Sequence, residues 1–242
     1  MNQRKNTLVM LATVLALTAL GQTCIRRSNA ESAPKYKIAI IDTGYDVTRA
    51  VHRLKLCESG HYNFRNDTPT VGFTQIHGTL VASIIAEQLK GVNYCAVIFQ
   101  VETKNGHFLD ASLTRAVTMA IKQNVTIVNM SYQGYMTSLK ERFALERLSA
   151  SGAVTFEAAG NEGQNLDYQC DAFPTCYGID NIFPVGAIDP DTTTKAKYSN
   201  HGKMIKLWFS GRTTYNGDEY NGTSFAAPRA LCDYVLRKEK RK

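Results

Sequence analysis

The stretch YKIAII, residues 36–41, decides the fold class, because it is a continuous apolar run. Such a run is typical of a β-strand that is buried on both faces of a sheet. It ends at the residues Asp42, Thr43 and Gly44, a combination that favours a turn. The stretch therefore predicts a central strand in a sheet that is covered on two sides.

Working outward from this strand, similar segments alternate with helical patterns. Apolar residues at helical spacing predict helices over 77–89, 111–123, 139–150 and 225–240, and strands are expected at 96–101, 125–130, 153–158, 181–188 and 205–209. Residues 45–76 and 164–180 are expected to be irregular. Strands that alternate with helices of about a dozen residues predict an α/β fold with three αβα layers and a mostly parallel central sheet. The composition of the 242 residues, 44% hydrophobic and 20% charged, fits one such domain.

Residues 1–30 have the features of a signal peptide. Arg4 and Lys5 form a basic start, the run 8–20 is apolar, and small residues lead up to Ala30. We expect cleavage after Ala30 and an exported protein, secreted or periplasmic, with no stable membrane span after cleavage. An uncleaved anchor is the alternative.

Removal of residues 1–30 also changes the charge. Four basic residues and no acidic one are lost, so Lys+Arg falls from 28 to 24 against 21 Asp+Glu, and the net charge falls from +7 to +3. No nucleic-acid partner is expected, although the run 237–242 is strongly basic. That run is predicted to be a solvated helix end, where basic residues complement the helix dipole.

Five cysteines follow residue 30. An exported chain can form disulfides, and the odd number leaves at least one thiol unpaired or paired between chains. Cys170 and Cys176 are close together in a predicted loop and are the first predicted pair. Cys57 and Cys95 are the second. No cysteine spacing resembles a metal site.

Polar residues of four kinds fall where predicted strands end or helices begin. Asp42 ends the first strand, Asn161 follows the strand 153–158, and His77 and Ser224 each begin a helix. Each of them alone also has an ordinary role as a turn former or a helix cap. In open α/β sheets, however, ligands bind outside the carboxyl ends of the strands. Together they supply an orienting carboxylate, a base, a nucleophile and an oxyanion donor, which is what acyl transfer requires.

The stretch GTSFAAP, residues 222–228, surrounds the candidate nucleophile. Gly222 lets the backbone approach a substrate closely, and Thr223 is expected to cap the helix with its hydroxyl. The first N–H groups of the helix would point towards negative charge that develops beside Ser224.

These motifs together resemble the signatures of the subtilisin-like serine protease (subtilase) family. DTG at 42–44, HGT at 77–79 and GTSFAAP at 222–228 follow the order of that family, and AAGNEG at 158–163 is similar to its segment with the oxyanion Asn. The similarity extends from about residue 36 to residue 236. It implies a subtilisin-like fold and a peptidase catalytic domain over residues 31–242.

The resemblance also implies roles for residues. Ser224 is expected to be the nucleophile, His77 the base, Asp42 the residue that orients the imidazole, and Asn161 the oxyanion donor. An extended substrate is expected to pair with two segments by strand addition. These segments are Ser131, Tyr132, Gln133 and Gly134, and Ala158, Ala159 and Gly160. No cofactor or metal is expected; the structural calcium sites of the family correspond to no residues that the motifs identify.

Three functional interpretations stay open. The first is an exported serine endopeptidase that acts through an acyl-enzyme on protein or peptide substrates. The second is a non-catalytic or weakly active subtilase-like binding protein, and the third is a hydrolase of esters or small amides. About five residues separate Ala30 from the first strand. This spacing leaves no room for an N-terminal pro-domain. Three alternatives stay open: the domain folds unaided, a trans-acting inhibitor or pro-domain is a further partner, or the chain is a reduced and inactive homologue.

Glu157 is unusual, because it places a carboxyl group on a strand that is expected to be buried. A buried Glu157 would need a partner or would stay protonated. If it instead faces the substrate pocket, with Glu162 near the rim, it favours substrates with a basic residue before the scissile bond.

Overall fold

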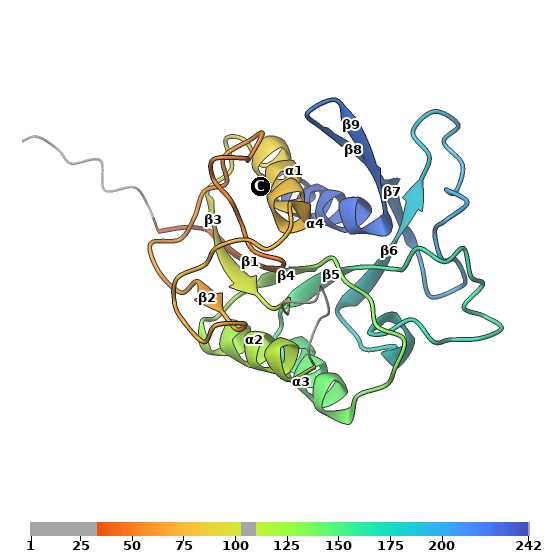
Figure 1. Ribbon diagram of the computed structural model, residues 1–242. Coiled ribbons are helices and arrows are strands. Elements are labelled where there is room, and N and C mark those ends of the chain that lie inside the picture. The colour runs from red at the N-terminus through yellow and green to blue at the C-terminus, as the bar shows by residue number, and fades with distance from the viewer. Residues whose placement is uncertain (1–32, 103–109, 242) are drawn as a thin grey trace, which may run out of the picture. The chain divides into compact units, whose positions relative to one another are not determined.

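Seven parallel strands form the central sheet of the unit Pro34–Lys242, in the order β2-β3-β1-β4-β5-β6-β7 (Figure 1). The strands are β1 (Tyr36–Asp42), β2 (Tyr62–Asn63), β3 (Tyr94–Gln100), β4 (Ile127–Met130), β5 (Val154–Ala158), β6 (Ile182–Ile188) and β7 (Leu207–Ser210). This computed structural model describes residues 33–102 and 110–241. The predicted signal peptide, residues 1–30, lies outside the described residues.

Four helices cover the two faces of the sheet. They are α1 (His77–Gln88), α2 (Asp110–Lys122), α3 (Leu139–Ala150) and α4 (Thr223–Lys240). Figure 1 shows α1 and α4 on one face, and α2 and α3 on the other. The sequence prediction of an α/β fold with three αβα layers and a mostly parallel sheet is therefore confirmed.

Strand β1 shows why the sheet is covered on both sides. Its side chains alternate between two apolar clusters, because successive residues of a strand point to opposite faces. Ile38 and Ile40 pack with the helices α1 and α4, whereas Ala39 and Ile41 pack with α2 and α3. All four side chains are fully buried, so the apolar run 36–41 fits the central position that it predicted.

Helix α3 has clear boundary signals. The Ser138 hydroxyl accepts a hydrogen bond from the Glu141 N–H at 3.2 Å, and Gly152 follows the helix with a left-handed φ of +85°.

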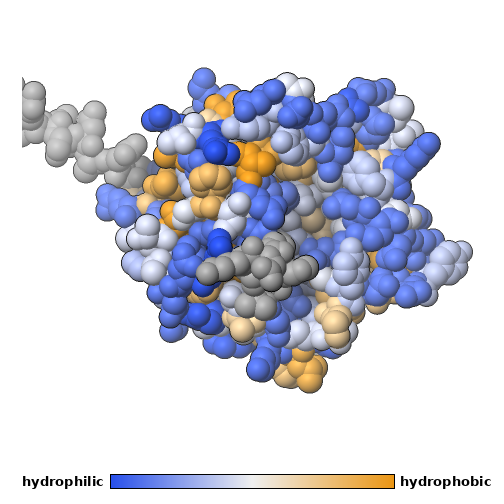
Figure 2. Space-filling model, in the orientation of Figure 1, coloured by the Kyte–Doolittle hydropathy of each residue, from blue (hydrophilic) through white to orange (hydrophobic). Residues whose placement is uncertain are grey.

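The face of the molecule that Figure 2 shows is mainly hydrophilic, with an apolar patch where α3 lies. Leu139 and Phe143 are exposed apolar residues of this helix. Among the described residues, no helix combines the length and the apolar character that crossing a membrane requires.

The sequence prediction missed several short elements. Besides β2 and the short 3₁₀ helix Thr175–Tyr177, it missed an antiparallel hairpin of β8 (Arg212–Tyr215) and β9 (Asp218–Asn221). Asn216 and Gly217 form its two-residue turn, and both have positive φ angles, 51° and 87°. Asn-Gly is the preferred pair for such a turn. The hairpin leads directly into Gly222 and helix α4.

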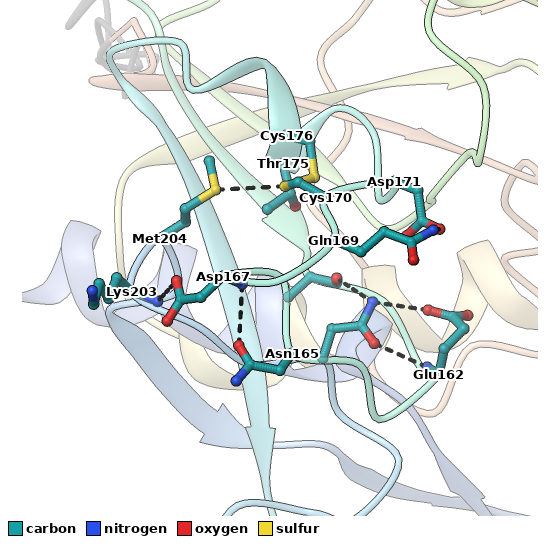
Figure 3. Close-up of a disulfide and its surroundings, with 12 residues drawn as sticks. Glu162, Asn165, Asp167, Gln169, Cys170, Asp171, Thr175, Cys176, Lys203 and Met204 are labelled. Atoms are coloured by element: carbon teal, nitrogen blue, oxygen red, sulfur yellow. Dashed lines mark hydrogen bonds between the residues drawn. A yellow bond between two sulfur atoms is a disulfide. The ribbon is translucent and has the colours of Figure 1, made fainter.

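Both predicted disulfides are present, Cys57–Cys95 and Cys170–Cys176. The second closes a loop beside the sheet, where the Cys170 sulfur also lies 3.7 Å from the Met204 sulfur (Figure 3). Among the described residues, Cys232 is the cysteine that stays free; it is buried in α4, and burial raises the pKa of its thiol.

Candidate active site

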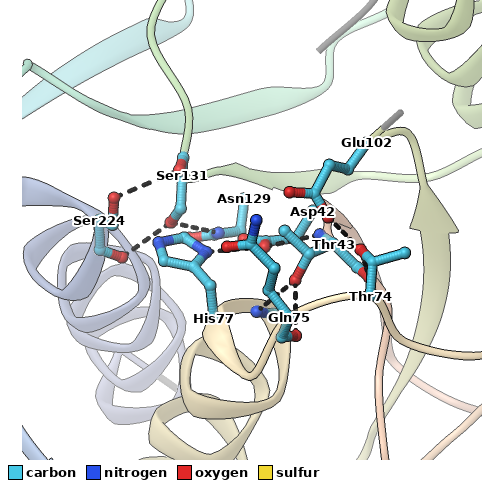
Figure 4. A network of polar contacts seen from close by, with 10 residues as sticks. Asp42, Thr43, Thr74, Gln75, His77, Glu102, Asn129, Ser131 and Ser224 are labelled. Atoms are coloured by element: carbon cyan, nitrogen blue, oxygen red, sulfur yellow. Dashed lines mark hydrogen bonds and ion pairs between the residues drawn. The ribbon is translucent and has the colours of Figure 1, made fainter. Parts of the chain in front are cut away.

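The end of β1 and the start of α1 bring Asp42 and His77 together. The Nδ1 atom of His77 lies 2.8 Å from Oδ1 of Asp42, whose carboxylate is fully buried (Figure 4). The same Oδ1 accepts the Thr43 N–H at 2.7 Å, and the Thr43 hydroxyl accepts the Gly78 N–H at 2.9 Å. A Cβ atom at Gly78 would stand only 2.3 Å from the carbonyl oxygen of Gly44. The two turns can approach closely because the residue after His77 is glycine.

Electrostatics favour the protonated form of His77. Burial acts to lower its pKa, but the neighbouring Asp42 carboxylate raises it, and Glu102 adds to this effect, so that the pKa lies above its ordinary value. Glu102 is 1% exposed and accepts a hydrogen bond from the Thr74 hydroxyl, whose oxygen also lies 3.2 Å from the Thr43 carbonyl oxygen (Figure 4). Sequence analysis missed Glu102, because no local motif marks a carboxyl group that reaches His77 only through the fold.

Ser224 lies in the first turn of α4 and is tied to Ser131, the residue that follows β4. The Ser224 hydroxyl donates to the Ser131 carbonyl at 3.3 Å, and the Ser131 hydroxyl donates to the Ser224 carbonyl at 2.8 Å. The second bond has a local cause. A helical carbonyl normally accepts the N–H four residues later, but that residue is Pro228, which has none.

The base and the nucleophile face the same space. The imidazole of His77 lies between Ser224 and Asp42 in Figure 4, and its ring centre is 5.6 Å from that of Phe225, the next residue of α4. Within the described part of the chain, no hydrogen bond joins the Ser224 hydroxyl to His77, since that hydroxyl points to Ser131.

Asn161 contacts the start of α4 with one end of its amide. Its Oδ1 accepts the Thr223 N–H at 2.8 Å and the Thr223 hydroxyl at 3.0 Å. The prediction that Thr223 caps the helix is therefore wrong. Thr223 is already the first helical residue, and its hydroxyl instead accepts the Gly160 N–H at 3.1 Å. The acceptor for the helix N–H comes from Asn161, which is 62 residues earlier in the sequence.

The amide of Asn161 lies beside Gly222, with its Oδ1 occupied by Thr223. A Cβ atom at Gly222 would lie 3.7 Å from both Nδ2 and Oδ1 of Asn161 and 3.8 Å from the backbone nitrogen of Ser224. Two N–H donors thus border one small space, which is open because residue 222 has no side chain. Such a pair of donors can stabilise an oxyanion.

The two segments expected to bind substrate lie on either side of Ser224, but several of their backbone groups have partners. Gly134 exchanges two hydrogen bonds of 2.8 Å with Phe173. Gly160 donates to Thr223, and its carbonyl accepts the Asn200 N–H at 3.0 Å. Strand addition through the backbones of Gly134 and Gly160 is therefore not available in this structure.

The remaining predicted segment residues differ in exposure. Ser131, Tyr132, Ala158 and Ala159 are buried, whereas Gln133 is half-buried. The Ala159 N–H donates to the Val185 carbonyl, and the Ala159 carbonyl accepts the Asn200 side chain at 3.1 Å.

Asn200 holds the segment around Gly160 and Asn161 in place. It is fully buried, and its Oδ1 accepts the backbone N–H groups of Glu162 and Gln164, while its Nδ2 donates to the Glu162 carboxylate at 2.8 Å. Its position indicates that it positions the oxyanion segment.

Glu157 is fully buried and accepts the Thr175 hydroxyl at 2.7 Å. Burial raises its pKa to about 8. This agrees with the expectation that a buried Glu157 needs a partner or stays protonated. It lines a cavity of about 390 Å³ between β5, β6 and the loop before β7, and the described lining of that cavity includes neither Ser224 nor Asn161. Glu157 thus gives no support to the hypothesis of basic substrates.

No candidate metal centre is found in residues 33–102 and 110–241, since these ranges contain no group of three or more suitable His, Cys, Asp or Glu side chains.

A family model described as the subtilase family matches residues 34–231. The chain belongs to the subtilase family. This subtilase brings together three distant parts of its sequence: the Asp42–His77 pair, Asn161 and Ser224.

Curated subtilase relatives are similar over most of this chain. A thermostable alkaline protease of Halalkalibacterium halodurans is 30% identical over 84% of this chain and 57% of its own length. An intracellular serine protease of Paenibacillus polymyxa is 30% identical over 84% of this chain and 66% of its own length. Subtilisin DY of Bacillus licheniformis is 28% identical over 79% of this chain and 72% of its own length. This subtilase therefore spans little more than half the length of several of its relatives.

Solved structures support the same fold. A lanthipeptide protease has a TM-score of 0.72 at 21% identity and covers 86% of this chain and 76% of its own. A cold-adapted subtilisin-like serine proteinase has a TM-score of 0.67 at 21% identity and covers 86% of this chain and 77% of its own.

Proposed function

We propose that this subtilase is an exported serine endopeptidase that hydrolyses peptide bonds through an Asp42-His77-Ser224 triad. The observation that carries the proposal is the 2.8 Å contact between Asp42 and His77, with Ser224 facing the imidazole from the start of α4. An imidazole held by a buried carboxylate beside a serine hydroxyl is the arrangement of a general base and its nucleophile.

In the acylation step, Ser224 Oγ attacks the carbonyl carbon of the scissile bond, and His77 Nε2 takes its proton. Asp42 Oδ1 accepts the Nδ1–H of His77, which fixes the tautomer and stabilises the imidazolium. His77 then protonates the leaving amine as the C–N bond breaks. In the second step, water attacks the ester carbonyl carbon and His77 takes a proton from it. The bond between this carbon and Ser224 Oγ then breaks, His77 returns the proton to Oγ, and the acyl part of the substrate leaves with a new carboxyl group.

The negative charge on the carbonyl oxygen is stabilised by the Asn161 Nδ2 and the backbone N–H of Ser224. Both donors border the space beside Gly222, and the Asn161 amide is oriented before substrate arrives because Thr223 holds its Oδ1. Loss of the corresponding side-chain donor in a subtilisin lowers turnover roughly 10²–10³-fold, and we expect a similar loss for Asn161→Ala.

The substrate is proposed to be a protein or peptide that lies between the segments 131–134 and 158–160, with no cofactor taking part in the reaction. A trans-acting inhibitor or pro-domain is a further proposed partner. Export would be directed by residues 1–30, so N-terminal sequencing of protein from the culture medium or periplasm should begin at Glu31. A chain that begins at Met1 would contradict the proposed cleavage.

The catalytic proposal is tested by labelling the purified protein with a fluorophosphonate, with casein degradation measured in parallel. Wild type and the control Ser151→Ala, at an exposed serine after α3, should be labelled and degrade casein. Ser224→Ala should do neither. Labelling that persists in Ser224→Ala, or that is absent from wild type, would overturn the assignment.

The alternative function is that of a non-catalytic or weakly active subtilase-like binding protein. It is favoured by one observation, the hydrogen bond from the Ser224 hydroxyl to the Ser131 carbonyl in place of one to His77. It predicts that peptides bind, whereas the fluorophosphonate does not label Ser224.

A further inference from the structure

The side chain of Gln133 lies directly over Gly160. A Cβ atom at Gly160 would stand 1.9 Å from Gln133 Oε1, 2.3 Å from Asn200 Nδ2 and 2.6 Å from Gln133 Cδ. No side chain other than hydrogen fits at residue 160 while Gln133 and Asn200 are in these positions. The amide of Gln133 thus bridges the gap between the segment after β4 and the segment after β5.

The two segments that enclose this gap both contact the start of α4, where the candidate nucleophile Ser224 lies. Ser131, two residues before Gln133, exchanges two hydrogen bonds with Ser224. Gly160 donates its N–H to Thr223, the residue before Ser224. A group that reaches Ser224 between the two segments therefore meets the Gln133 amide.

The geometry of acyl transfer indicates which part of a substrate enters here. The carbonyl oxygen must lie between Asn161 Nδ2 and the Ser224 N–H, and the leaving amine must lie on the side of His77, which protonates it. The residue that supplies the carbonyl then lies on the other side, next to Gly160, which directly precedes Asn161. Its side chain points into the space that Gln133 occupies.

The backbone around this gap is fixed by hydrogen bonds. Gly160 is held through both its N–H and its carbonyl, by Thr223 and Asn200. The backbone on either side of Gln133 is held at Ser131 and at Gly134, which pairs with Phe173. Asn200, the other side chain beside Gly160, is fixed by the backbone N–H groups of Glu162 and Gln164, whereas Gln133 is half-buried and its side chain lies beside the Glu162 carboxylate. Replacement of the side chain at position 133 is therefore the change that can widen the gap.

We propose that Gln133 is a specificity-determining residue, whose side chain fills the space beside Gly160 and restricts the residue before the scissile bond to Gly, Ala or Ser. The inference rests on the proposed function, because it concerns the substrate of the same site. Replacement of Gln133 by glycine removes three heavy atoms of the side-chain amide and two carbons, and opens room for a large apolar side chain. Burial of a Phe side chain in that room corresponds to a gain of about 10- to 100-fold.

The test compares two peptide substrates that differ only in Ala or Phe before the scissile bond. Wild type should have at least tenfold higher kcat/KM for Ala, and Gln133→Gly should raise kcat/KM for Phe about 10- to 100-fold with little change for Ala. Gln133→Ala should lie between them, which keeps the test decisive if the glycine variant folds poorly. Gln169→Ala, at an exposed glutamine outside the gap, should behave as wild type. A wild type that hydrolyses the Phe peptide as well as the Ala peptide, or an unchanged ratio in both Gln133 variants, would overturn the inference.

A binding measurement separates this inference from the proposed function. The same two peptides are titrated into Ser224→Ala and into Ser224→Ala with Gln133→Gly. Tighter binding of the Phe peptide to the second protein, by about tenfold or more, supports the role of Gln133 even if wild type shows no turnover, and equal affinities contradict it. Absence of fluorophosphonate labelling in wild type contradicts the proposed function alone.

Discussion

The two halves of the active site differ in how far they are prepared for the proposed reaction. The Asp42–His77 half is joined by a 2.8 Å hydrogen bond, and a further carboxyl group, Glu102, lies nearby. In the other half, the Ser224 hydroxyl is hydrogen-bonded to the Ser131 carbonyl and not to the imidazole. The amide of Asn161, the proposed oxyanion donor of this half, is nevertheless oriented by Thr223.

This difference follows from what each half rests on. Asp42 lies at the end of a buried strand and His77 at the start of a helix. Their two turns are joined by the hydrogen bond from the Gly78 N–H to the Thr43 hydroxyl, and the Thr43 N–H donates to Asp42. Ser224 lies in the first turn of α4, and its own carbonyl has no N–H partner four residues later, because that residue is Pro228. The Asp42–His77 contact is therefore held by its own two turns, whereas the position of the Ser224 hydroxyl depends on its hydrogen bond to Ser131.

Breaking the base half should have the largest effect on activity. In Asp42→Asn the amide favours the wrong tautomer of His77 and no longer stabilises the imidazolium, so kcat should fall about 10⁴-fold. The control Asp233→Asn, in the exposed part of α4, should keep wild-type kcat. A fall of less than about tenfold in Asp42→Asn, with the protein folded by circular dichroism, would mean that Asp42 does not orient the base.

The next effect concerns the oxyanion space of the nucleophile half. Gly222→Ala should place a methyl group beside the Asn161 amide and the Ser224 nitrogen, where it competes with the substrate carbonyl oxygen, and should lower kcat roughly 10²–10³-fold, as loss of a donor does. The fold should tolerate it, because Gly222 has extended backbone with φ 166° and ψ 153°. The matched control is Gly72→Ala, where a Cβ atom meets nothing within 4 Å. Wild-type kcat in both variants would show that the oxyanion forms elsewhere.

A smaller effect is expected for the Ser131 hydroxyl. Ser131→Ala leaves the Ser224 carbonyl without a donor, which should lower the free energy of unfolding by about 1–3 kcal/mol and reduce kcat by about tenfold or less. Pro228→Ala returns an N–H that can bond to this carbonyl within the helix. In a double-mutant cycle, urea unfolding should therefore show that Ser131→Ala costs less when residue 228 is alanine. Equal costs in both backgrounds would show that the two donors do not compete for one carbonyl.

The smallest effect is a shift of the pH profile. Glu102 raises the pKa of His77, and His77 must be neutral to accept the proton of Ser224. Glu102→Gln removes a negative charge beside the imidazole, so its pKa falls and the acidic limb of the kcat/KM profile moves to lower pH. Glu87→Gln, at an exposed acid at the far end of α1, should leave the limb where it is. A limb that does not move, or that moves to higher pH, would exclude this role of Glu102.

Much of the fold was predictable from local patterns. The boundaries of β1, α1, α2 and α3 were predicted to within one residue of the structure, because each carries a buried apolar run or a helical stripe that ends at a turn residue. The hairpin β8–β9 was missed although Asn216-Gly217 is a strong hairpin signal. Its strands are short and mainly polar, with no apolar run to identify them.

The parts of the site that were missed depend on contacts between distant residues. Neither AAGNEG nor GTSFAAP alone shows that Asn161, rather than Thr223, supplies the acceptor for the N–H at the start of α4. The same holds for Gln133 over Gly160, since its neighbours in the sequence do not reveal which side chain fills the gap. The motifs thus identified the reacting groups, whereas the packing between segments determines the room around them.

The pair of bonds between Ser131 and Ser224 joins residues 93 positions apart, and this has a consequence for biosynthesis. Contacts of such long sequence separation form late, since a long loop must be closed first. The Asp42–His77 pair, 35 positions apart, closes a much shorter loop. A nascent or partly unfolded chain is therefore expected to form the Asp42–His77 contact before Ser224 is positioned, and the proposed peptidase would stay latent until α4 has packed on the sheet.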